Sequence, residues 1–251
     1  MYVTLLVLAA LWGAVTGALV PRAAHRLSTE PVDAEDAPGA PDAGEAGEAG
    51  EAGEAGEVRG EDEPAEAAPV PPYPSTVLVP LSTSLVCAAL AAATGPRPEL
   101  VAWLLLTPFA VLLVIVDRAV RRLPDRVTLP LAAAAAVLLG GASLLPGARG
   151  SWEDALLGGL VLGGCYAVFF VFNPRGLGFG DVKLALSLGV ALGWYGWAVL
   201  LVGGIMGSAL GGVYGVGLMV RRRDRKVLMP LGPFMIVGAL VGVLLGALAA
   251  R

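Results

Sequence analysis

Charged residues are scarce in this chain of 251 residues. Asp, Glu, Lys and Arg make up 15% of it and hydrophobic residues 56%, whereas soluble globular proteins carry roughly 25% charged residues. This composition therefore argues against a soluble domain. The charges are also unevenly spread, because 14 of the 21 acidic residues lie between Glu30 and Glu66. The net charge of −4 consequently describes neither that acidic segment nor the basic remainder.

Cysteine and histidine are almost absent. Cys87 and Cys165 each lie in an apolar run and form no C-x-x-C pair, which argues against a disulfide framework or a zinc site. We interpret both thiols as small apolar residues packed among helices. His25 is the one histidine, so a Ser-His-Asp mechanism has little support. Nothing in the sequence indicates a metal, a cofactor or nucleic-acid binding.

Long uncharged runs are abundant. A bilayer is crossed by about 20 apolar residues, and seven runs of suitable length contain no Asp, Glu, Lys or Arg: 1–21, 67–96, 100–116, 127–148, 155–174, 184–220 and 227–250. The run 184–220 contains the turn-forming stretch Gly193-Trp194-Tyr195-Gly196, so we divide it into two spans. The sequence predicts an all-α, polytopic membrane bundle of about eight transmembrane helices.

The basic residues support this count. With eight spans and the amino terminus outside, 14 of the 17 Lys and Arg residues fall on one side of the membrane, as the positive-inside rule requires of the cytoplasmic side. Merging the divided run would move the basic cluster 221–226 to the outside. The first span has no preceding basic region and is followed by Arg22, His25 and Arg26, which favours a retained anchor over a cleaved signal peptide. We expect a multi-pass protein of the cytoplasmic (inner) membrane.

Residues 30–74 differ from the rest of the chain. Five consecutive Ala-Gly-Glu triplets, 43–57, precede a Pro-rich stretch, and such a composition buries no core. We expect a disordered acidic cytoplasmic linker; a docking tail for a basic partner is the alternative. The predicted organisation is a first span with its basic flank, 1–29, then the linker, 30–74, and a seven-span core, 75–251.

Glycines recur at four-residue spacing in the last two predicted spans. Such small-residue faces let helix backbones approach closely. We therefore expect close packing along two series, Gly203, Gly207, Gly211 and Gly215, and Gly238, Gly242 and Gly246.

Seven acidic residues remain outside the linker. The predicted topology places Glu99, Glu153 and Asp154 in outer loops and Asp224 in a basic cluster, which leaves Asp117, Asp125 and Asp181 beside spans at the inner edge. Taken singly, Asp125 and Asp181 are also acceptable helix N-caps. Asp181, however, follows a glycine loop containing Gly178 and Gly180, and Asp117 stands 64 residues earlier at the same edge. Two carboxylates from different helices that share a water meet the requirement for aspartyl proteolysis.

These motifs resemble those of the prepilin leader peptidases of type IV pili and type II secretion, which are GxGD-type membrane aspartyl proteases. The resemblance rests on Asp117 with Leu123-Pro124-Asp125 and Thr128-Leu129-Pro130, on Gly178-Phe179-Gly180-Asp181-Val182-Lys183, and on Pro230-Leu231-Gly232-Pro233-Phe234. It implies that Asp117 and Asp181 are catalytic and that Gly178, Gly180, Lys183 and Asp125 support them. It also implies a prepilin or pseudopilin substrate, cut at the cytoplasmic membrane face.

One difference from the family concerns methylation. Bifunctional members carry paired C-x-x-C motifs between the first two spans, associated with methylation from S-adenosylmethionine, whereas this chain has the acidic linker there and no cysteine. We therefore expect a peptidase without N-methyltransferase activity. The amino-terminal end of a helix favours an anion and the carboxyl-terminal end disfavours it. On this ground Asp181, at a span's amino terminus, would be the base, and Asp117, at a carboxyl terminus, would be the acid. Lys183 and the basic cluster 118–126 are interpreted as topology-setting charges or as attractants for acidic lipid or substrate.

Other classes of membrane protein remain as alternatives. A polytopic transporter that uses inner-edge aspartates for proton or substrate coupling would also combine carboxylates with glycine-broken helices. A presenilin-like protease shares GxGD but not its other signatures, and a catalytically silent membrane protein is a third choice. The sequence does not determine the oligomeric state.

Overall fold

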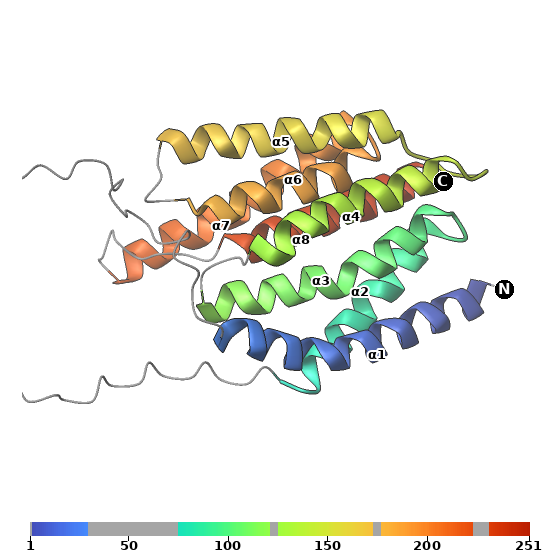
Figure 1. Cartoon of the computed structure of the whole chain (residues 1–251), viewed down its shortest axis with the longest axis horizontal. Coiled ribbons are helices and arrows are strands. Elements are labelled where there is room, and N and C mark those ends of the chain that lie inside the picture. Colours follow the sequence, from blue (N-terminus) through green and yellow to red (C-terminus); the bar gives the residue numbers. More distant parts are fainter. Residues whose placement is uncertain (1, 30–74, 121–124, 173–176, 223–230) are drawn as a thin grey trace, which may run out of the picture.

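The structure is a computed structural model that describes residues 2–29, 75–120, 125–172, 177–222 and 231–251. Within these ranges the chain forms helices and no strand (Figure 1). The eight helices are α1 (Tyr2–Thr29), α2 (Leu78–Thr94), α3 (Glu99–Val120), α4 (Asp125–Ser143), α5 (Trp152–Phe172), α6 (Phe179–Gly193), α7 (Trp197–Arg222) and α8 (Gly232–Ala249). The prediction of an all-α membrane bundle is confirmed. The proposed acidic linker lies outside the described residues.

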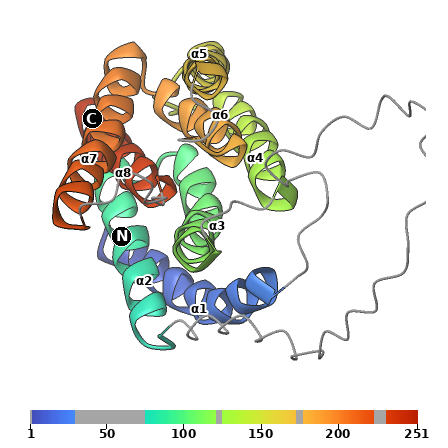
Figure 2. The ribbon, with the colours of Figure 1, turned by 90° about the vertical axis from the view of Figure 1, so that its left-hand side faces the viewer.

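Successive helices run up and down the bundle. Both chain termini lie at one end of it, and the residues that end α3 and begin α4, α6 and α8 lie at the other (Figure 1). Viewed along the helices, α1 and α2 cover one side of α3, while α4, α5 and α6 form a group on its other side (Figure 2). Helix α8 packs against α2, α3, α6 and α7. The core is therefore built around α3, α6 and α8.

Five helices, α1, α3, α5, α7 and α8, are long and apolar enough to cross a membrane. Helix α2 and the apolar part of α4 are shorter, and α6 has 15 residues. The predicted division of the run 184–220 is confirmed, because α6 ends at Gly193 and α7 begins at Trp197. Gly196 lies between them with a φ of 98°, a conformation that glycine adopts without steric cost.

Glycines bring two helix pairs into backbone contact. At the α7–α8 crossing, a Cβ added to Gly238 would lie 2.6 Å from the Cα of Gly207, so the glycine faces expected in the last two spans do pack there. A second crossing was not anticipated from the sequence. A Cβ on Gly189 of α6 would lie 2.8 Å from the Cα of Gly159 in α5. Small residues thus set the spacing of the α5–α6 and α7–α8 pairs.

We predict that Gly189→Ala destabilises the protein. The added methyl group would meet backbone atoms of α5 and force the two helices apart, a form of overpacking that costs about 1–3 kcal/mol. Thermal unfolding of the purified protein in detergent measures the loss. Gly164→Ala is the matched control, since nothing lies within 4 Å of its Cβ position. Equal unfolding temperatures for the two variants would contradict the prediction.

Two expectations about single residues need correction. Glu99 was expected in an outer loop, but it begins α3 with a fully buried side chain whose Oε1 lies 3.5 Å from Nη1 of Arg97. A buried carboxylate requires such a partner, and charge counting does not reveal burial. Of the two thiols expected to pack among helices, Cys87 is buried and Cys165 is exposed.

Candidate active site

Asp117 lies in the last turn of α3, where it is almost completely buried with 4% of its surface exposed. Gly232, the first residue of α8, faces its carboxyl group. A Cβ added to Gly232 would lie 2.8 Å from Oδ2 of Asp117 and 3.6 Å from Cδ2 of Leu184 in α6. Helices α3, α6 and α8 therefore converge around this carboxyl group. Its Oδ2 accepts no hydrogen bond from any residue in the described ranges.

Asp181 is the third residue of α6. Its Oδ2 accepts a hydrogen bond of 3.3 Å from the backbone N–H of Gly178, which is the N-cap residue and has an extended backbone (φ −75°, ψ 145°). The alternative in which Asp181 itself caps the helix is therefore wrong, because the N-cap lies three positions earlier at Gly178. The glycine loop holds the carboxylate by a backbone donor, as expected where an acidic side chain lies in a helix's first turn.

The structure brings Asp117 and Asp181 together. The two carboxyl groups are close enough to interact electrostatically. Leu184, one turn after Asp181 on α6, also lies beside Gly232, which contacts Asp117. Two carboxyls separated by 64 residues in the chain thus lie within electrostatic range of each other at one end of the bundle. We call the pair the dyad and this end of the bundle the dyad end.

The remaining candidate residues have different environments. Gly178 supplies the hydrogen bond to Asp181, and Gly180 lies between them in the first turn of α6. Lys183, interpreted above as a topology-setting charge or an attractant for acidic lipid or substrate, is buried. Its Nζ lies 4.5 Å from the centre of the Phe179 ring, a cation–π distance. Asp125 begins α4, but its side chain lies outside the described part of the structure.

The acid and base roles cannot be assigned from helix ends alone. That reasoning considered only the helix that carries each aspartate. The structure places the amino terminus of α8 against Asp117, so a positive helix end faces this carboxyl as well as Asp181. The helix dipoles therefore favour the anion at both positions and do not distinguish them.

Two residues near the dyad had no role assigned from the sequence. Gly232 belongs to the motif 230–234, which carried the family resemblance without a function; its position shows that the missing side chain makes room for Asp117. Tyr166 of α5 is buried, shares a 2.9 Å hydrogen bond with Ser208 of α7 and lies within electrostatic range of Asp181. A single tyrosine inside an apolar run gives no sequence signal for this position.

The described residues around the dyad include no cluster of metal ligands. Among the described residues, no group of three or more His, Cys, Asp or Glu side chains is arranged to hold a metal ion.

Comparison with known proteins identifies the family. Residues 104–216, which include both aspartates, match the family described as type IV leader peptidases. The chain is 33% identical over 193 residues to a protein of Aeromonas salmonicida (strain A449), covering 75% of this chain and 63% of the relative. It is 34% identical over 176 residues to a protein of Aeromonas hydrophila, covering 67% of this chain and 58% of that relative.

A relative from Escherichia coli (strain K12) is 30% identical over 166 residues, which cover 63% of this chain and 70% of the relative. All three relatives bear the name prepilin leader peptidase/N-methyltransferase. No solved structure matches the chain. The chain spans less than two thirds of the Aeromonas relatives. The matched region, the dyad that it contains and the identity to these relatives show that the chain belongs to the type IV leader peptidase family.

Proposed function

We propose that this protein is a membrane-embedded aspartyl endopeptidase that removes the leader peptide of type IV prepilins or prepilin-like (pseudopilin) proteins. The observation that carries the proposal is the placement of Asp117 of α3 and Asp181 of α6 within electrostatic range of each other, at one end of the bundle. Both residues lie within the region that matches the family. A transporter that couples ions would place such groups near mid-depth of the bilayer, which this arrangement does not favour.

The mechanism follows from the chemistry of two close carboxyl groups. Because neighbouring carboxylates do not both ionise readily, one is ionised while the other holds a proton. The ionised carboxylate removes a proton from water as the water oxygen attacks the scissile carbonyl, and the protonated carboxyl donates a hydrogen bond to the carbonyl oxygen. The tetrahedral intermediate then collapses, and the leaving amine receives a proton from the dyad. The two roles belong to the pair, which titrates as a unit.

We place the site at the cytoplasmic face of the membrane. Exposed arginines at the dyad end include Arg22, Arg118 and Arg221, whereas Arg149 and Arg251 lie at the opposite end. Cytoplasmic loops carry the excess of basic residues in membrane proteins. The charge bias therefore supports hydrolysis on the cytoplasmic side.

We further propose that the protein cleaves without methylating. The names of its relatives include N-methyltransferase, but both cysteines of this chain lie in helices, Cys87 in α2 and Cys165 in α5. The segment between α1 and α2 thus contains none of the paired cysteines associated with that second activity.

One incubation tests both the removal of the leader and the absence of methylation. Purified enzyme is mixed with a prepilin from the same cell and S-adenosylmethionine, and the product is measured by intact-mass spectrometry. We expect a product that has lost its leader and carries an unmodified amino terminus. A methyl group on that terminus would contradict the proposal of a peptidase alone, and an intact leader would contradict the peptidase itself.

A further inference from the structure

A buried tyrosine of α5 lies beside the start of α6. The contacts between these two helices fix its level: the Cβ position of Gly163 faces the side chain of Leu186. Further along α5, the ring of Phe170 lies 5.5 Å from that of Phe179, measured between centroids. The two helices are therefore antiparallel, and Tyr166 lies level with the stretch of α6 between these two contacts. That stretch carries the dyad aspartate of α6.

The hydroxyl group of Tyr166 has a fixed hydrogen-bond partner on α7. Its oxygen lies 2.9 Å from Oγ of Ser208. The Ser208 hydroxyl donates its one proton to the backbone oxygen of Gly204, also at 2.9 Å, so Tyr166 is the donor in the bond between them. Ser208 is exposed on the outside of the bundle, and a hydroxyl in an apolar medium is costly without a partner. The bond therefore links α5 to α7 past the start of α6.

Tyr166 also packs against α6 itself. It belongs to a buried cluster that includes Val182, Leu184 and Ala185, all within four residues of the dyad aspartate. The phenol group lies within electrostatic range of Asp181. The linked tyrosine thus supports the segment of α6 that carries the catalytic carboxyl group.

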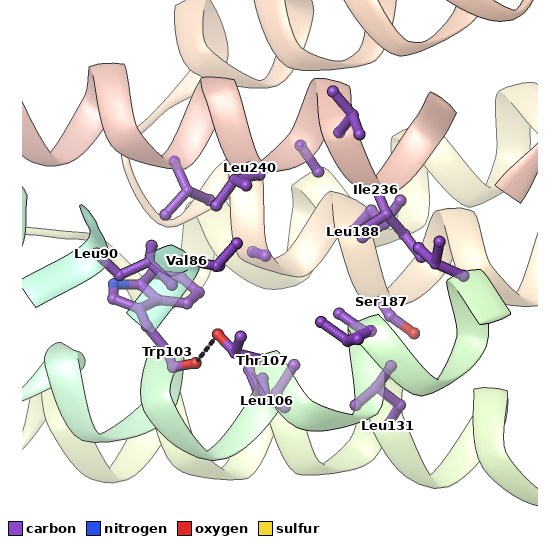
Figure 3. Close-up of a pocket in the computed structure, with 18 of the residues that line it drawn as sticks. Val86, Leu90, Trp103, Leu106, Thr107, Leu131, Ser187, Leu188, Ile236 and Leu240 are labelled. Carbon is purple, nitrogen blue, oxygen red and sulfur yellow. Dashed lines mark hydrogen bonds between the residues drawn. The ribbon is translucent and has the colours of Figure 1, made fainter. Parts of the chain in front are cut away.

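On another side, α6 borders a void. A cavity of about 320 Å³, with an almost wholly apolar lining, is enclosed by α2, α3, α4, α6 and α8. Ser187 and Leu188 of α6 line it, together with residues such as Leu106 of α3 and Ile236 of α8 (Figure 3). Side chains that border a void lose contacts on that side, so the position of α6 depends more strongly on the helices packed against its other sides.

We propose that Tyr166 is a positioning residue, whose hydrogen bond to Ser208 braces α5 against α7 and thereby holds Asp181 in its catalytic orientation. The inference rests on the proposed peptidase function and deepens it by naming a residue outside the dyad on which the rate depends. The proton of the Tyr166 hydroxyl is donated to Ser208. Tyr166 consequently acts through Asp181 and not on the substrate.

The test removes this one hydrogen bond from either helix. Tyr166→Phe keeps the ring and loses the hydroxyl, and Ser208→Ala loses the acceptor on α7. Ser208→Thr is the conservative variant, because it keeps a hydroxyl at an exposed position. Tyr214→Phe is the matched control: Tyr214 is a half-exposed residue of α7 in the half nearest the dyad end, and its ring packs on Phe234.

We expect Tyr166→Phe and Ser208→Ala each to lower kcat for a prepilin from the same cell and to leave its KM unchanged. A misplacement of 1 Å can cost about 100-fold in rate, and we expect about tenfold for a carboxyl group that is loosened but still present. The double variant should be no slower than the slower single variant, since both changes remove the same bond. Ser208→Thr and Tyr214→Phe should retain wild-type kcat.

Thermal unfolding shows whether each variant is folded, and the two single variants lie on different helices, so either one carries the test. Three results would overturn the proposal: an unchanged kcat in both single variants, a raised KM with normal kcat, or losses that multiply in the double variant. A lowered unfolding temperature with normal kcat would make the bond purely structural. Absence of cleavage by the wild type would instead refute the peptidase function and the brace with it.

Discussion

Replacing either Asp117 or Asp181 by asparagine is expected to abolish leader removal, with a loss of at least about 1,000-fold in kcat. An amide has nearly the shape of a carboxyl group but can neither take a proton from water nor supply one, and general acid–base catalysis contributes about 10²–10⁴-fold. Because the two carboxyls act as one unit, the double variant should be no less active than either single variant. The measurement is a cleavage time course with a prepilin from the same cell.

Controls for this experiment come from other acidic residues. Asp154→Asn removes the same charge at the amino terminus of α5, at the end of the bundle opposite the dyad, and should retain wild-type activity. Asp125→Asn at the start of α4 tests the supporting role proposed for that residue and should retain measurable cleavage. Activity that survives in Asp117→Asn or in Asp181→Asn would refute the dyad, whereas inactivity of Asp154→Asn would point to a general loss of folding.

Gly232→Ala is expected to impair catalysis while leaving the fold intact. The new methyl carbon would lie 2.8 Å from Oδ2 of Asp117, so the carboxyl group must turn away from its present position. Since this oxygen is the free end of a side chain, the displacement costs little stability. A shift of about 1 Å in a catalytic group can cost about 100-fold in rate, and we expect a loss of that size in kcat.

The matched control for this variant is Gly212→Ala on α7, where a Cβ would meet nothing within 4 Å. Steady-state kinetics and thermal unfolding are measured for both proteins. A lowered unfolding temperature with normal kcat in Gly232→Ala would show that Gly232 serves only packing. A normal kcat together with a normal unfolding temperature in Gly232→Ala would show that the Asp117 carboxyl is free to relax without loss of function.

The helices were predictable because membrane spans need only length and low charge. Uncharged runs revealed every helix, and the glycine-containing turn at 193–196 separated α6 from α7 as expected. The burial of Lys183 beneath Phe179 and the ion pair of Glu99 with Arg97 were not predictable. Both depend on which side of a helix faces the bundle, and an apolar run without polar alternation carries no such signal.

The candidate site was predictable in part. The glycine loop before Asp181 and the predicted placement of Asp117 at the same membrane edge were sufficient to nominate the pair. The contribution of α8 was not foreseen, since Gly232 lies 115 residues after Asp117 in the chain. Its approach to the carboxyl depends on the packing of α8 between α3 and α6, which no local pattern specifies.

By itself, the sequence determined the class of the protein. Few charges, long apolar runs and a one-sided distribution of basic residues require a membrane bundle with Asp117, Asp125 and Asp181 at one edge, because the bilayer excludes unpaired charge. Tertiary structure alone decided which surfaces meet: the glycine crossings of α5 with α6 and of α7 with α8, the helix end that faces Asp117, and the apolar cavity between α2, α3, α4, α6 and α8. These features depend on contacts between residues far apart in the chain, and in a bilayer such contacts are selected by shape and packing, which composition does not encode.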